Sequence, residues 1–116
     1  MNVTIYHNPR CSKSRQTLEL LRTRGIEPDV VEYLKVPPGP RTLKSLLEML
    51  GMEPRDLMRK GEKAYKAAGL DDPGLSRDDL IRAMVEHPML IERPIVTVDG
   101  KAALGRPPEN VLAILA

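Results

Sequence analysis

The segment VTIYHNPRCSKSRQTLELLRTRG, residues 3–25, decides the fold because it sets a strand pattern directly before a helix pattern. Residues 3–6 are β-branched and aromatic, a composition typical of a half-buried strand. Apolar positions then recur at helical spacing, and Gly25 is a stop signal. The loop between the two patterns holds Cys11, the only cysteine of the chain. The segment therefore predicts a strand and a helix joined by a loop that presents a thiol.

A cysteine at this position is favoured as a thiolate. The first turn of a helix presents unpaired backbone N–H groups and the positive end of the helix dipole. Arg10, Lys13 and Arg15 add positive charge nearby. Sites of this kind lower the pKa of a thiol from about 8.5 to between about 3.5 and 7.5. Cys11 is therefore a candidate nucleophile, although most lone cysteines are small buried apolar residues.

Length, charge and composition exclude several classes of protein. The chain has 116 residues, a net charge of +2 and neither Phe nor Trp, which fits one domain with an aliphatic core. One cysteine forms no intrachain disulfide, and the first residues lack the basic and apolar regions of an export signal, so we expect a cytoplasmic protein. No stretch reaches the ~20 apolar residues of a membrane span. Basic residues are interspersed with acids, so we expect neither a membrane nor a nucleic acid as partner.

The first helix pattern is followed by a second strand and then by a long helical region. Val30–Leu34 predicts a strand parallel to the first, which makes a βαβ unit. From Arg41 to Pro88 the apolar period is helical, so we expect a helical insert at about residues 40–88. Gly51 is expected to end one of its helices, and Ser76 with Asp79 resembles a capping box at the start of another.

The chain after the insert returns to strand signals. Ile95–Val98 and Lys101–Leu104 flank Asp99-Gly100, a two-residue hairpin signal that predicts an antiparallel pair. Pro107-Pro108-Glu109 then opens a last helix. The predicted order is β-α-β, a helical insert, then β-β-α, an α/β fold in one domain.

The spacing around Cys11 excludes several chemistries. A phosphatase of the type that cradles phosphate under its cysteine needs C-x-x-x-x-x-R, but the sixth residue after Cys11 is Thr17. A dithiol C-x-x-C is absent, because the third residue after Cys11 is Ser14. Any oxidised adduct on Cys11 therefore has to be resolved by an external thiol. The one cysteine and two histidines are too few for structural zinc.

Three arginines lie beside breaks in the predicted structure. Arg59 precedes Lys60-Gly61, Arg93 precedes Pro94, and Arg106 precedes Pro107. From position alone, these would be read as ordinary solvated arginines.

Three blocks of the sequence carry a resemblance to a known family. They are YHNPRCSKSR at residues 6–15, ERPIV at 92–96 and GRPPE at 105–109. Together they resemble the glutaredoxin-coupled arsenate reductase family, and the similarity covers essentially the whole chain, residues 1–116. The resemblance implies a single domain with a thioredoxin-like fold, a four-stranded mixed sheet with a helical insert between its halves.

The resemblance also implies roles for individual residues. Cys11 would attack arsenate, with His7 and Ser14 as further catalytic residues. The family's three oxyanion-binding arginines match Arg59, Arg93 and Arg106. Pro94 would follow a cis peptide bond.

The same resemblance implies the partners of the reaction. They would be arsenate or a similar oxyanion, glutathione as co-substrate, and glutaredoxin, with no bound cofactor or metal. The alternative reading is a thioredoxin-fold interaction or regulatory protein, or a reductase of another small substrate, without physiological arsenate activity.

Overall fold

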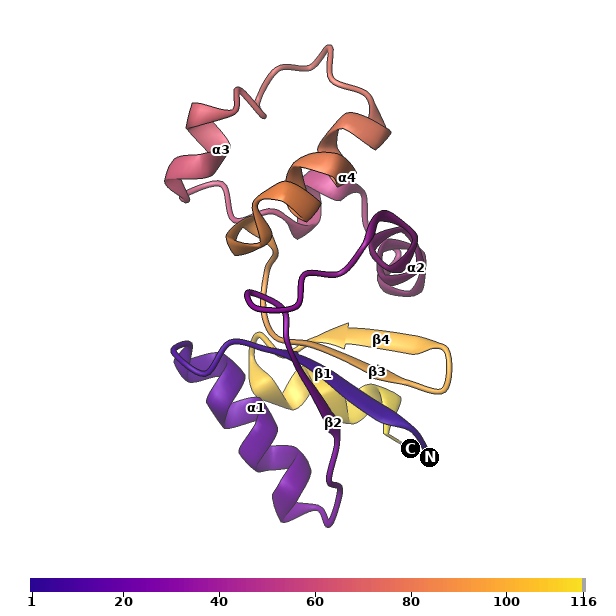
Figure 1. Ribbon diagram of the computed structural model, residues 1–116. Helices are drawn as coiled ribbons and strands as arrows, with labels where there is room; N and C mark the ends of the chain where they lie inside the picture. Colours follow the sequence, from indigo (N-terminus) through magenta and orange to yellow (C-terminus); the bar gives the residue numbers. More distant parts are fainter. Residues whose placement is uncertain (116) are drawn as a thin grey trace. The chain divides into compact units, whose positions relative to one another are not determined.

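The computed structural model describes residues 1–115 and divides the chain into two compact units. The sheet unit contains Met1–Val36 and the chain from Arg93 onward, and the helical unit contains Pro37–Glu92. Figure 1 shows the strands in the first unit and α2, α3 and α4 in the second. The helical unit includes the predicted insert, and extends it by a few residues at each end.

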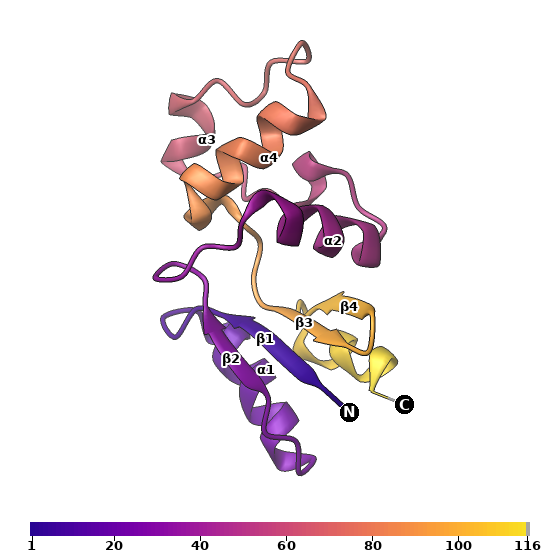
Figure 2. The same ribbon diagram turned by 45° about the vertical axis from the view of Figure 1, so that its right-hand side comes forward.

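The sheet unit contains four strands in the order β2-β1-β3-β4. The strands are β1 Val3–His7, β2 Asp29–Glu32, β3 Ile95–Val98 and β4 Lys101–Leu104. β1 pairs in parallel with β2 and antiparallel with β3, and β3 pairs antiparallel with β4 (Figure 2). The predicted mixed sheet, parallel pair and hairpin are confirmed, and the order is that of the thioredoxin-like fold. Asp99 and Gly100 both have positive φ, 48° and 81°, as a two-residue hairpin turn requires.

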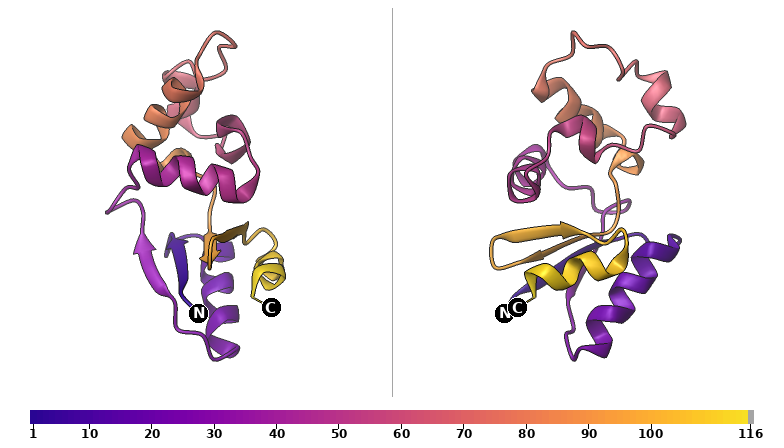
Figure 3. Two further views of the ribbon diagram at one scale, coloured as in Figure 1. Left: turned by 90° about the vertical axis from the view of Figure 1, so that its right-hand side faces the viewer. Right: turned by 180° about the vertical axis from the view of Figure 1, so that it is seen from behind.

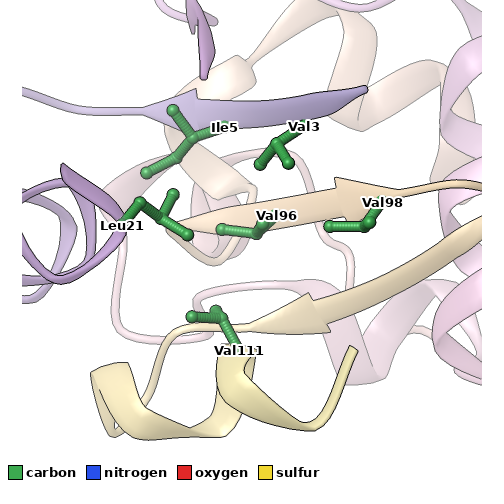
Figure 4. Close-up of a cluster of buried hydrophobic side chains, with 6 residues drawn as sticks. All are labelled: Val3, Ile5, Leu21, Val96, Val98 and Val111. Carbon is green, nitrogen blue, oxygen red and sulfur yellow. The ribbon is translucent and has the colours of Figure 1, made fainter. Parts of the chain in front are cut away.

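Two helices cover one face of the sheet. α1, Ser12–Thr23, connects β1 to β2, and it packs against η3, a 3₁₀-helix at Pro108–Ile114. Figure 3 shows the two helices together on this face of the strands. The core between these layers consists of Val3, Ile5, Leu21, Val96, Val98 and Val111 (Figure 4). Each such side chain contributes roughly 1.5 to 3 kcal/mol by leaving water, so this core fixes α1, and with it the thiol, against the strands.

The helical unit contains α2 Pro40–Leu50, α3 Lys63–Ala67 and α4 Arg77–Glu86. Short 3₁₀-helices, η1 Pro54–Leu57 and η2 Pro88–Leu90, lie in the connections. α2 ends at Gly51, which has φ 66°, and a capping box between Ser76 and Asp79 opens α4, as the sequence predicts. α4 packs against α2 and against η1.

A short backbone pairing joins the middle of the helical unit to its last residues. Arg59 N–H donates to the Leu90 carbonyl at 2.7 Å, and Glu92 N–H donates to the Leu57 carbonyl at 2.8 Å. Met58 and Ile91, opposite each other in this antiparallel bridge, are buried. The pairing holds Arg59 beside Glu92, the residue that immediately precedes Arg93.

Two predicted elements differ in detail from the structure. β2 runs from Asp29 to Glu32, whereas the sequence pattern extended to Leu34, because the amides of Lys35 and Val36 both donate to the Glu32 carbonyl and form a turn. The last helix is a 3₁₀-helix rather than an α-helix. Its i→i+3 bonds include Asn110 N–H to the Pro107 carbonyl at 3.0 Å.

Candidate active site

The loop after β1 is closed by its own backbone and by two side chains. Cys11 N–H donates to the Asn8 carbonyl at 3.0 Å, and Arg10 N–H donates to Asn8 Oδ1 at 3.0 Å. Arg15, one turn into α1, reaches back to donate from Nη1 to the Pro9 carbonyl at 2.9 Å. These bonds turn the chain sharply and place Cys11 as the N-cap residue of α1, in an extended conformation.

Cys11 is partly exposed at the start of α1. Burial raises the pKa of this thiol, but other groups outweigh it and the pKa is lowered overall. The Ser14 amide and the Arg93 guanidinium lower it by hydrogen bonding, Arg93 also acts through its charge, and the Lys13 amide adds to the effect. The sulfur is therefore stabilised as a thiolate by two backbone amides of α1 and by one guanidinium from outside the helix.

His7 and Ser14 form a buried pair beneath the loop. His7 Nδ1 lies 2.6 Å from Ser14 Oγ, and Asn8 N–H donates to the same oxygen at 3.0 Å. Burial lowers the pKa of His7 more than Glu32, beside it on β2, raises it, and Arg22 and Arg15 lower it further. A neutral imidazole either accepts the Ser14 hydroxyl proton or donates its own to Ser14. In both tautomers the pair fixes Ser14, whose amide faces the Cys11 sulfur.

Two arginines flank the open end of the β3–β4 hairpin. Arg93 precedes β3 and Arg106 follows β4, and Arg106 Nη1 donates to the Arg93 carbonyl at 3.3 Å. The Arg93–Pro94 peptide bond is cis, which the family resemblance implies. Arg106–Pro107 is also cis, which sequence analysis missed. The sheet unit thus gathers Cys11, His7, Ser14, Arg93 and Arg106.

Arg59 lies in the helical unit. Its Nη1 donates to Glu92 Oε1 at 2.9 Å, and its Nε is 3.5 Å from Glu62 Oε1. All three side chains are half-buried. Arg59 is therefore held by two carboxylates of its own unit, an arrangement that the sequence pattern did not indicate.

Sequence reasoning also missed positioning residues in the sheet unit. The Asn8 amide oxygen closes the loop, a role that the sequence analysis did not predict although Asn-Pro is a known turn signal. Arg15 was predicted only as a nearby charge, whereas it clamps the Pro9 carbonyl. No local signal indicated the contact of Thr17 with Gly105.

The described part of the chain adds two further observations. Among residues 1–115, no group of three or more His, Cys, Asp or Glu side chains is arranged to hold a metal ion. Over the same residues, no helix combines the length and apolar character needed to cross a membrane.

The site around Cys11 combines a stabilised thiolate with guanidinium groups. Such a combination suits nucleophilic attack on a small oxyanion.

Comparison with known proteins gives a consistent set of relatives. The ArsC family model matches residues 6–114. The chain is 57% identical to the protein YfgD of Escherichia coli (strain K12), over 97% of this chain and 96% of that protein. It is 52% identical to an arsenate reductase of Neisseria meningitidis (serogroup B, strain MC58), over 97% of each chain. The solved structure of an arsenate reductase from Vibrio cholerae superimposes with a TM-score of 0.97 at 55% identity, covering 99% of this chain and 98% of that one.

Proposed function

The chain belongs to the ArsC family, and from this premise we propose that it reduces arsenate to arsenite through a covalent adduct on Cys11. The observation that carries the proposal is the place of Cys11 at the start of α1, where the Ser14 and Lys13 amides and the Arg93 guanidinium act on its sulfur and lower its pKa. The names of relatives near 50% identity, such as the arsenate reductase of Haemophilus influenzae at 48%, support the substrate.

The first step is attack by the Cys11 thiolate on arsenic(V). An S–As bond forms, and one arsenate oxygen leaves as water or hydroxide. Arg93 and Arg106 bind the remaining oxygens, since a planar guanidinium matches two oxyanion oxygens at once. Phosphate has a similar shape and charge, so discrimination against it belongs to the thiolate step.

The later steps need thiols from outside the chain, because Cys11 is its only cysteine. Glutathione displaces a second oxygen from arsenic and forms a glutathionyl–arsenic bond. A glutaredoxin thiolate then attacks the glutathione sulfur and forms a mixed disulfide, and the electron pair of the broken S–As bond reduces arsenic to the trivalent state. Water releases arsenite and restores the Cys11 thiol, so two external thiols supply both electrons. We therefore also propose that the protein acts in the cytoplasm, where thiols are kept reduced.

The remaining site residues support these steps. We assign Ser14 and His7 to the catalytic site, because the Ser14 amide stabilises the sulfur and the His7–Ser14 bond fixes that amide. Arg59 is assigned to the arsenic intermediates formed after the first attack. Its positive charge is offset by Glu62 and Glu92, which makes it a weak attractant for the incoming oxyanion.

A coupled assay tests the proposal. Arsenate, glutathione, glutaredoxin, glutathione reductase and NADPH are combined, and NADPH consumption is followed with the wild-type protein and with Cys11→Ser. We expect turnover by the wild type and a loss of more than about 1,000-fold in the variant, because a serine hydroxyl is a far weaker nucleophile at neutral pH. Equal NADPH consumption by the two proteins, each shown to be folded by circular dichroism, would contradict the proposal.

A further inference from the structure

Thr17 is a fully buried polar residue in the middle of α1. Its Oγ1 donates to the Lys13 carbonyl at 2.8 Å, one turn earlier in the helix. The Gly105 carbonyl lies 3.5 Å from the same oxygen. The bond to Lys13 fixes the Thr17 side chain in one orientation, with its hydroxyl and methyl groups toward Gly105.

Gly105 is buried between this threonine and Pro94. Its N–H donates to the Pro94 carbonyl at 2.9 Å and continues the pairing of β3 with β4. A Cβ atom at position 105 would overlap Thr17 Oγ1, and would lie 2.8 Å from Pro94 Cγ and 3.1 Å from Thr17 Cγ2. The φ of Gly105 is not in the left-handed region, so glycine is required here by space rather than by backbone conformation.

The Thr17–Gly105–Pro94 contact lies next to both arginines of the sheet unit. Pro94 follows Arg93 and Gly105 precedes Arg106. On the helix side, Thr17 is bonded to Lys13, whose own amide helps to stabilise the Cys11 thiolate. We propose that Thr17 and Gly105 are positioning residues, whose close contact sets how near Arg93 and Arg106 lie to the thiol. This inference rests on the proposed function for its kinetic readout only.

The physical basis of the proposal is that hydrogen bonds and reaction rates depend steeply on the distances between the groups involved. Hydrogen bonds to a charged group weaken quickly as they lengthen, and a displacement of about 1 Å in a reacting arrangement can cost roughly 100-fold in rate. The Thr17 side chain is buried, and Pro94 Cγ belongs to a closed pyrrolidine ring. Neither group can therefore make room for a new methyl group by rotating away. A methyl group on residue 105 therefore has to push the arginine-bearing turns away from α1.

The test uses Gly105→Ala, Thr17→Ala and the double variant. In each protein the pKa of Cys11 is measured by thiolate absorbance against pH, and the KM for arsenate is measured in the coupled assay. For Gly105→Ala we expect a higher Cys11 pKa and a KM raised about 10-fold or more. Thr17→Ala removes the two side-chain atoms that the new Cβ would meet, so the double variant should recover part of both losses. Gly39→Ala is the control, because nothing lies within 4 Å of a Cβ added there.

A purely structural role gives a different pattern. It would lower the unfolding midpoint of Gly105→Ala while leaving the Cys11 pKa and the KM of the folded protein at wild-type values, and that result would overturn the proposal. Losses in the double variant that simply add would also overturn it, since residues in direct contact have to couple. If the wild type does not turn over arsenate, the proposed function fails, whereas the thiol pKa still decides this inference.

A milder variant tests the proposal if neither Gly105→Ala nor the double variant folds. Thr17→Val keeps the shape of threonine but places a larger methyl group against Gly105. A small rise in the Cys11 pKa is then the expected result. A wild-type pKa and KM in folded Thr17→Val would overturn the proposal.

Discussion

The candidate-site arginines of the two units have different partners. In the sheet unit, the Arg93 guanidinium acts on a thiol and lowers its pKa. In the helical unit, the Arg59 guanidinium lies 2.9 Å from Glu92 Oε1 and 3.5 Å from Glu62 Oε1, so one positive charge faces two negative ones. Arg93 and Arg59 therefore have separate electrostatic roles, each within its own unit. Arg93 stabilises the anionic form of the Cys11 sulfur, and Arg59 pairs with two carboxylates of its own unit.

The largest losses of activity are expected when Arg93 or Arg106 is replaced. Alanine at either position removes charge-assisted hydrogen bonds to the oxyanion, each worth about 1.5 to 3 kcal/mol, so kcat/KM should fall about 10- to 150-fold. Lysine should retain part of the activity, because it keeps the charge but loses the planar fork. Steady-state kinetics with arsenate measure both effects.

Arg41→Ala is the matched control for these variants, since Arg41 is an exposed arginine in the first turn of α2. It should behave as the wild type. If the Arg93 and Arg106 variants match Arg41→Ala, these two arginines do not bind the substrate.

A smaller and different effect is expected at Arg59. Because Glu62 and Glu92 offset its charge, Arg59→Ala should raise the KM for arsenate little and should lower kcat by roughly 10-fold. The same steady-state assay separates the two constants. A rise in KM as large as that of Arg93→Ala would show that Arg59 also binds the incoming oxyanion, and would remove the distinction between the two units.

Local sequence patterns were sufficient for the elements that position the thiol. The β-branched run before His7, the helical stripe with its glycine stop and the Asp99-Gly100 turn each depend on neighbouring residues, and the structure contains all three. The capping box of α4 was also readable, because its two partners are three residues apart. Local propensity and periodicity therefore fixed the order of elements and the place of Cys11 at a helix start.

Long-range contacts could not be predicted in this way. The pairing of Arg59 with Glu92 joins residues far apart in the sequence, through the bridge of Met58 with Ile91. The Thr17–Gly105 contact depends on how closely α1 approaches the end of β4, and a glycine between strand and proline reads as an ordinary break. The cis bond at Arg106–Pro107 also had no local signal. Tertiary packing decides these features.

The smallest effect is expected from His7, through the pH dependence of folding stability. Burial lowers its pKa, so the unfolded chain binds this proton more readily than the folded one. The stability that results is complete above the unfolded pKa of about 6.5 and is lost as the pH falls from there through the folded pKa. His7→Asn should remove this loss, which amounts to about 1.4 kcal/mol for each unit of pKa shift.

Urea unfolding of the wild type and of His7→Asn at several pH values measures this effect. An identical pH dependence in the two proteins would show that folding does not lower the pKa of His7.

The most direct test of the central claim is the titration of Cys11 itself, by thiolate absorbance against pH, in the wild type and in Arg93→Ala. Ser14, Lys13 and Arg93 lower the pKa in the structure, so the wild-type midpoint should lie below the value of about 8.5 for a free thiol. Arg93→Ala should move the midpoint upward, and Arg59→Ala should move it less. A wild-type midpoint at or above that of a free thiol, or a midpoint that does not respond to Arg93→Ala, would contradict the claim that this unit builds a thiolate site.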